Sequence, residues 1–213
     1  MTYVFSVEEA AQRLFVSLSE STGWKYVKSK NCLKKTVRDL LFEIDFFFSK
    51  WNISHENVEV NAEFRLCCKS YGKSPEDSVI ASLSYRPDLY VPYYSCWYDI
   101  STEEKLLSSF EDLNGRIQNT AVSLCRQFED DYLATAESLL KEHFDEYNVH
   151  LDFIADKLGM SAIREKVREI YDGLSDEMKK QIADYKNGAR NALWMNGRTN
   201  LKFIVDNDLV KYD

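Results

Sequence analysis

The stretches LLFEIDFFF, residues 40–48, and VEVNAEFRLCC, residues 58–68, decide the fold. In both stretches apolar residues occupy every second position, and charged or polar residues fill most of the positions between. A period of two is typical of a strand that turns one face to a core and the other to water. The polar connection between the two stretches is short, which favours an antiparallel hairpin.

Two further stretches extend this hairpin into a sheet. Residues 24–30 alternate between lysines and apolar or aromatic residues, and residues 79–85 form an apolar run that ends at Arg86-Pro87. Turn residues at 71–75 separate the last two strands. The pattern predicts a four-stranded antiparallel meander with one apolar face under helices and one wetter face.

The first helix is predicted over residues 7–20. Ser6 and Glu9 form a capping box at its start. Gly23 suits the residue that follows a helix, because glycine adopts the left-handed backbone conformation without strain.

The second half of the chain reads as helical. Apolar residues at every third or fourth position predict one long helix over residues 102–146, with Ser101 as its N-cap. At about 1.5 Å per residue this helix is longer than a compact domain of this size is wide. We therefore expect it to bend, break or protrude, with Asn114-Gly115 as the expected break. Shorter helices are predicted over residues 148–158, 161–171, 175–194 and 200–212.

The predicted fold class is therefore α+β: an N-terminal helix, an antiparallel meander and a long-helix C-terminal half. Residues 1–100 are expected to hold the helix and the sheet. Residues 101–213 are expected to form the helical region, packed on the sheet as one domain. Gly and Pro are scarce, at 7 and 3, which favours long regular elements over disorder.

The charge and the cysteine content of the chain bear on the cellular location of the protein. The net charge is −8, and residues 101–213 carry most of the excess acid. Five irregularly spaced cysteines without a recognisable secretory leader predict reduced thiols in a cytoplasmic protein. No apolar run approaches the roughly 20 residues of a membrane span, so no membrane association is expected.

No complete catalytic, metal or nucleotide motif is present. The sequence lacks Gly-x-Ser-x-Gly, Cys-x-x-Cys and a pair of histidines at helical spacing. We therefore predict no catalytic residue, no metal ligand and no cofactor, and interpret His55, His143 and His150 as surface or capping residues. Catalytic groups assemble in space rather than in sequence, so an enzyme stays open as an alternative.

A cluster of carboxylates is expected on the wetter face of the sheet. Glu43 and Asp45 face Glu59 and Glu63 across the predicted hairpin, and like charges opposite each other repel. Either a bound cation or the neighbouring Arg65 and the lysines of residues 25–35 would relieve this repulsion. We predict Glu43, Asp45 and Glu63 as contacts to a partner.

The segment YRPDLYVPYYSCWY, residues 85–98, has no clean period and is crowded with aromatic rings. Tyr and Trp are enriched at protein interfaces, because they bury a large area at a low entropic cost. The rings could instead fold back onto the open end of the sheet. We predict Tyr90, Tyr93, Tyr94 and Trp97 as partner contacts.

Six positive charges gather between residues 25 and 38, with no acid among them before Asp39. Such a run can bind phosphate groups or nucleic acid. It can also be the charged edge of a sheet, where lysines discourage the addition of another strand. The edge interpretation is favoured, because the chain as a whole is acidic.

The N-terminal third of the chain resembles other proteins in the order of its elements. The order of a helix, Gly23-Trp24-Lys25, a Lys/Ser-containing hairpin and the strand 40–48 followed by Ser49-Lys50-x-Asn52 resembles uncharacterised bacterial domain-of-unknown-function proteins. Some of these are similar in outline to immunity proteins, which neutralise a toxin from a neighbouring strain. The resemblance covers about residues 7–70. It implies a bacterial, protein-binding chain and transfers no functional residues.

These observations predict a protein-binding module without catalysis that meets a basic partner through acidic and aromatic residues. One alternative is an enzyme that handles a small molecule or nucleotide between sheet and helices. Another is nucleic-acid binding through residues 25–38. A homodimer through the long helix is a further expectation about partners.

Overall fold

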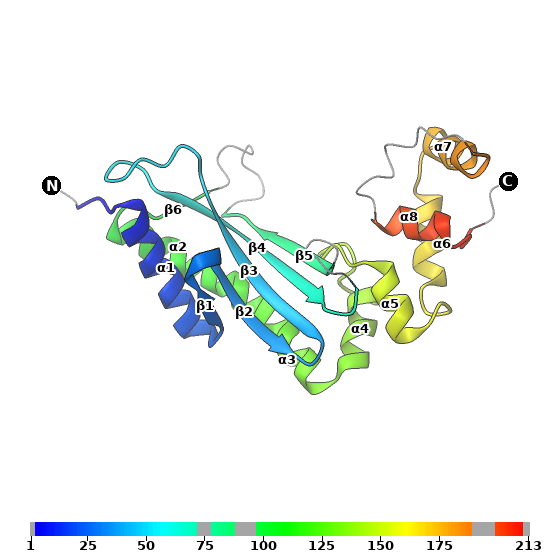
Figure 1. The fold of residues 1–213 in the computed structure, drawn as a ribbon, viewed down its shortest axis with the longest axis horizontal. Coiled ribbons are helices and arrows are strands. Elements are labelled where there is room, and N and C mark those ends of the chain that lie inside the picture. The colour runs from blue at the N-terminus through cyan, green and yellow to red at the C-terminus, as the bar shows by residue number, and fades with distance from the viewer. Residues whose placement is uncertain (1–2, 72–77, 88–96, 189–198, 211–213) are drawn as a thin grey trace. The chain divides into compact units, whose positions relative to one another are not determined.

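The computed structural model describes residues 3–71, 78–87, 97–188 and 199–210 (Figure 1). The chain divides into two compact units, Met1–Asp131 and Tyr132–Asp213, called unit 1 and unit 2 below. The predicted α+β class is confirmed, with an N-terminal helix, an antiparallel sheet and then several helices. The boundary between the two units lies after Asp131. The expected packing of residues 101–213 on the sheet as one domain stays a prediction.

The sheet of unit 1 is a meander in which each of five strands pairs with the next in sequence. A short sixth strand, β6, returns to pair with β4. All pairings are antiparallel, as predicted. The strands are β1 (Lys25–Val27), β2 (Cys32–Val37), β3 (Leu40–Phe48), β4 (Glu59–Cys68), β5 (Val79–Tyr85) and β6 (Tyr98–Asp99).

The prediction of four strands was wrong at β2, which fills the expected connection after Asn31. Its sequence CLKKTV hides the period of two, because lysines occupy positions on both faces. Lys34 lies opposite Glu43 on β3, while Lys35, on the other face, reaches Glu129 at 3.2 Å. A long lysine can cover apolar surface with its stem and keep its ammonium group in water, so the pattern misleads.

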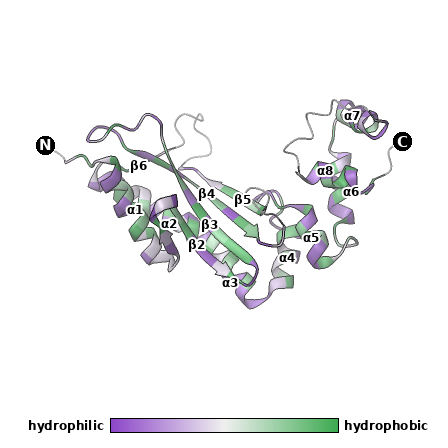
Figure 2. Ribbon diagram, viewed as in Figure 1, coloured by the Kyte–Doolittle hydropathy of each residue, from purple (hydrophilic) through white to green (hydrophobic). Residues whose placement is uncertain are grey.

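The core of unit 1 lies between the sheet and three helices: α1 (Val7–Thr22), α2 (Glu103–Ile117) and α3 (Ser123–Asp130). The β3–β4 register aligns Phe42 with Leu66 and Ile44 with Phe64 on one face. Figure 2 shows green, hydrophobic stretches along β3 and β4. The rings of Phe15 and Phe46 stack with centroids 4.0 Å apart, which joins α1 to this face.

The predicted caps of α1 are confirmed. The Ser6 hydroxyl accepts a hydrogen bond from the Glu9 amide, and Gly23 has a φ of 70°. The predicted cap of α2 shifts by one residue: Thr102 caps the helix, and Ser101 donates to Asp99 instead.

The long helix breaks later than expected. A π-helical turn, Gln118–Val122, joins α2 to α3, so the backbone remains helical from Glu103 to Asp130. The predicted break at Asn114-Gly115 was wrong, because Gly115 lies inside α2. The helix ends at Asp131, whose extended backbone has φ −142° and ψ 102°. The π turn inserts a residue into the helical repeat and lets the apolar face continue through it.

Unit 2 contains five described helices: α4 (Tyr132–Lys141), α5 (Leu151–Leu158), α6 (Arg164–Asp172), α7 (Asp176–Lys186) and α8 (Thr199–Asp206). The side chain of Asn200 donates to the Val149 carbonyl and accepts from the Leu151 amide, which ties α8 to the start of α5. Ile182, Leu201 and Val205 form a small buried cluster. None of the described helices has both the length and the apolar character of a membrane span.

Candidate functional site

The sheet face opposite α1, α2 and α3 carries the polar positions of the strands and is called the open face. The register places Lys34, Glu43 and Arg65 side by side on β2, β3 and β4. Asp45 and Glu63 form the next row. All three carboxylates that the sequence predicted as partner contacts therefore lie together on the open face.

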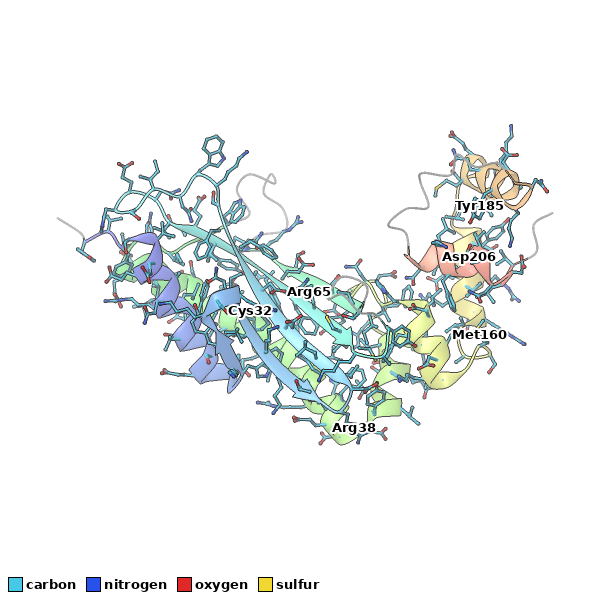
Figure 3. The ribbon with its side chains drawn as sticks, in the orientation of Figure 1. Cys32, Arg38, Arg65, Met160, Tyr185 and Asp206 are labelled. Atoms are coloured by element: carbon cyan, nitrogen blue, oxygen red, sulfur yellow. The ribbon has the colours of Figure 1, made fainter. Side chains whose placement is uncertain are left out.

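Glu43 is the centre of this cluster, with only 3% of its surface exposed. One carboxylate oxygen pairs with the Lys34 ammonium group, and the other lies 3.7 Å from an Arg65 nitrogen. The same guanidinium nitrogen of Arg65 lies 2.5 Å from Asp45 Oδ2. We expected either a bound cation or neighbouring basic side chains to relieve the repulsion between the carboxylates. The structure shows basic side chains in this place, with Arg65 and Lys34 beside the acids. Figure 3 labels Arg65 near the middle of β4.

The thiols of the open face are packing groups. Cys67 is buried and donates a weak hydrogen bond to Glu43 Oε2 at 3.8 Å. Burial raises the pKa of Cys67 to about 11, so it stays a protonated thiol at neutral pH. Cys32, fully buried at the start of β2, also has a pKa raised by burial. Neither thiol suits a nucleophile, which requires the thiolate.

Glu63 differs from the other two carboxylates. It is half-buried, and within the described ranges it makes no hydrogen bond or ion pair. Burial raises its pKa above the ordinary value; Arg65 opposes this shift and Asp45 adds to it. An ionised carboxylate that is partly removed from water without a hydrogen bond or ion pair lowers the stability of the fold. Such a residue points to a role in binding rather than in folding.

Replacing Glu63 by Gln is therefore expected to raise the free energy of unfolding at pH 7. The folded-state pKa of Glu63 lies above its unfolded value, so the ionised form destabilises the fold above the folded-state pKa. This cost disappears as the pH falls through the folded-state pKa to the unfolded one, and the advantage of Gln should shrink with it. Urea unfolding of both proteins at pH 7 and pH 4 measures this difference. A variant that is less stable than the wild type at pH 7 would contradict the expectation.

Exposed aromatic rings lie at one end of the open face. Phe47 is 47% exposed and pairs with Asn61 on β4. Trp97 is half-buried and directly precedes β6, where Tyr98 faces the core. Strand β6 pairs with Glu59 and Val60 of β4, so Trp97 precedes β6 at the same end of the sheet as Phe47. Tyr90, Tyr93 and Tyr94 lie outside the described residues.

Helix α2 holds both ends of the predicted aromatic segment. The Tyr98 hydroxyl donates to Asp112 at 2.9 Å, and Arg116 also donates to this carboxylate, at 2.8 Å. Arg116 reaches further to the carbonyl of Pro87 at 3.2 Å. The ion pair of Asp112 and Arg116 on α2 thus holds both β6, which ends the segment, and Pro87, which lies near its start.

Sequence reasoning missed Phe47 and the neighbouring Trp51, which is 72% exposed in the β3–β4 connection. Phe47 follows Glu43 and Asp45 at the polar positions of β3, and this break in the alternation was the available signal. Trp51 stands in an otherwise polar turn. An exposed ring at either place is available to a partner.

The basic run 25–38 does not form one exposed patch. Lys34 and Lys35 lie on β2, which is paired on both sides, so the edge interpretation was wrong for these two residues. Only β1, with Lys25, is an outer strand of this region. Lys28, Lys34 and Lys35 each pair with a carboxylate.

Among the described residues, neither the histidines nor any group of metal-ligating side chains forms a second candidate site. His55 is exposed with its Nδ1 2.9 Å from the Val4 carbonyl oxygen, and His143 Nδ1 lies 2.8 Å from Glu146. Burial lowers the pKa of His150, which keeps it neutral at pH 7. Across the described ranges no three His, Cys, Asp or Glu side chains are grouped as metal ligands.

Comparison of the chain with protein-family models, curated proteins and solved structures finds no significant match. The resemblance to immunity-like bacterial proteins therefore stays a prediction. The function has to be argued from the open face itself.

Proposed function

We propose that this chain is a protein-binding module without catalysis and that it holds its partner on the open face of the sheet. The observation that carries the proposal is Glu63, a half-buried carboxylate that forms no hydrogen bond or ion pair within the described residues and lies in the row next to the exposed ring of Phe47. The predicted contact Trp97 directly precedes β6, which pairs with β4 at the same end of the sheet. A partner that supplied a cation to Glu63 and an apolar surface to the two rings would satisfy all three groups.

The charge cluster supports this proposal, because its ion pairs order the side chains of the open face before a partner binds. Glu43 is too deeply buried to touch a partner, so its part is to hold Lys34 and Arg65 in place. Arg65 in turn holds Asp45 at 2.5 Å. A surface that is ordered before binding loses less side-chain entropy on association. Such a surface suits tight binding better than one of freely moving chains.

The acidic balance of the chain favours a basic partner. Opposite charges speed the encounter of two proteins and exclude partners of the same charge. The prediction of an immunity-like role fits this chemistry, since a basic toxin would be recognised by an acidic surface. A bacterial source and a cytoplasmic location belong to the same proposal.

Packing inside unit 1 weighs against the enzyme alternative. That alternative needs a cavity between sheet and helices, and the rings of Phe15, Phe42, Phe64 and Phe128 are fully buried in this space. Pairing of three lysines with acids likewise weakens the nucleic-acid alternative, because these ammonium groups are already neutralised.

The test compares two tagged full-length proteins as bait in lysate of the source organism. One is the wild type and the other is the double variant Phe47→Ala/Glu63→Gln. We expect one stoichiometric protein partner on the wild type and at least about tenfold less on the variant, as for the loss of a central interface contact. Quantitative mass spectrometry gives the ratio, and the salt dependence of binding tests the charge contribution.

Leu133→Ala is the matched control, because this leucine is 55% exposed on α4 and belongs to unit 2, whereas the open face belongs to unit 1. It should capture as much partner as the wild type. Equal capture by the double variant, or no stoichiometric partner on the wild type, would contradict the proposal. Thermal unfolding of all three proteins separates lost binding from lost folding.

A further inference from the structure

A groove of about 530 Å³ lies on the outer side of the helical layer, between α1 and the first turns of α2. Helix α1 lines it with Glu9, Arg13 and Val16, which share one face at helical spacing, and α2 contributes Leu106 and Leu107. The stretch from Glu9 to Ser17 covers about 12 Å at 1.5 Å per residue. The groove therefore matches about two turns of a third helix.

The floor of the groove is apolar and open to solvent. Val16 is 37% exposed and Leu107 is 50% exposed. Both sit on helices that already bury a full apolar face against the sheet, so neither is needed for the core of unit 1. Helices bind in such grooves through apolar side chains at i, i+3, i+4 and i+7.

The rim of the groove is acidic. Arg13 lies 2.6 Å from Glu103 and 3.4 Å from Glu9, and its guanidinium carbon lies 4.6 Å from the ring centroid of Phe5, so its charge is already satisfied. Glu9 and Glu103 are the two carboxylates that line the groove. Glu104 and Glu111 lie beside it, at i−3 and i+4 from Leu107 on the surface of α2; both are exposed, and neither forms an ion pair within the described ranges. The carboxylates around the groove therefore outnumber the cations.

We propose that this groove is a docking site for a basic amphipathic helix of a partner protein. Leucine-like anchors of the helix would cover Val16 and Leu107, and its lysines or arginines would meet Glu104 and Glu111. A second copy of this chain is the poorer occupant, because two acidic rims would face each other across the symmetric contact. The site is independent of the open face, since it lies on the outer side of the helices that cover the opposite face of the sheet.

The probe for this site is a fluorescein-labelled synthetic peptide of leucine and lysine, about 18 residues long, with its leucines at helical spacing. A peptide of the same composition with leucines at every second position is the control for charge alone. Fluorescence anisotropy with the full chain at low salt measures both affinities. We expect a dissociation constant on the order of micromolar for the helical peptide and at least about tenfold weaker binding for the permuted one.

Leu107→Lys tests the floor of the groove and Leu133→Lys is its matched control, because both leucines are half-exposed on helices. The first variant should weaken peptide binding at least about tenfold and the second should leave it unchanged. Glu104→Gln/Glu111→Gln should weaken binding less and reduce its dependence on salt. Circular dichroism checks that each variant is folded.

Hydrogen exchange locates the bound peptide. Slower amide exchange in α1 and in the first turns of α2 would support the site. The proposal is overturned if the helical peptide does not bind, if both peptides bind equally, if Leu107→Lys has no effect, or if protection appears only elsewhere in the chain.

Discussion

Replacing Phe42 by Ala is expected to lower the free energy of unfolding of unit 1 by about 3–5 kcal/mol. Phe42 is fully buried on β3, and its ring centroid lies 6.0 Å from that of Trp24 and 6.1 Å from those of Phe64 and Phe128. Its removal opens a cavity where the sheet, the end of α1 and α3 meet. Close-packed rings on three sides cannot collapse into that space without moving backbone.

Urea unfolding followed by tryptophan fluorescence, to which Trp24 contributes as a buried neighbour of Phe42, measures the loss. Phe47→Ala on the same strand is the matched control, since this ring points to the open face and is half-exposed. Its cost should stay below about 1 kcal/mol. Equal losses for the two variants would show that the core does not lie on the face where the register places it.

Replacing Glu43 by Gln is expected to cost about 3–5 kcal/mol, the usual result of breaking a buried ion pair from one side. The loss arises because Lys34 and Arg65 are partly buried and stay charged after the substitution removes the negative charge of the carboxylate between them. The measurement is again urea unfolding at neutral pH. Glu137→Gln, which removes an exposed partner of Lys141, is the control and should cost less than about 1 kcal/mol.

A second substitution identifies the cause of that loss. In Glu43→Gln, Arg65 keeps its pairing with Asp45, whereas Lys34 loses its pairing with Glu43. Adding Lys34→Met to Glu43→Gln removes this ammonium charge and should restore part of the lost stability. A double variant that is less stable than Glu43→Gln alone would show that lost packing, and not unpaired charge, dominates at this site.

The sheet and the first helix could be predicted because local and overall preferences agree there. The alternation in residues 40–48 and 58–68 requires one buried face, and the cap at Ser6 does not depend on distant residues. Strand β2 was missed because Lys35 stands on the covered face and reaches Glu129, a residue far away in sequence. A pattern read along the chain contains no information about such a partner.

The break in the long helix was misplaced for a similar reason. Gly115 weakens a helix by about 1 kcal/mol, and the burial of Leu113 and Ile117 on either side more than compensates for this cost. The site was predicted only in part. Alternation placed Glu43, Asp45 and Glu63 on one face, but only the side-chain contacts of the described residues show that Glu63 is the carboxylate without an ion pair there. The groove between α1 and α2 was not foreseen, because its walls come from distant segments.

The order of strand pairing has a consequence for how this protein folds. Strands β1 to β5 each pair with their neighbour in sequence, so each step closes a short loop at a small entropic cost. Strand β6 is the exception, because Tyr98 must find Val60 across the whole length of β5 and the segments beside it. We expect this pairing to form late, after the meander. The end of the open face that holds Trp97 would then be the last part of the proposed binding surface to assemble, and a chain caught before that step would be compact and still unable to bind.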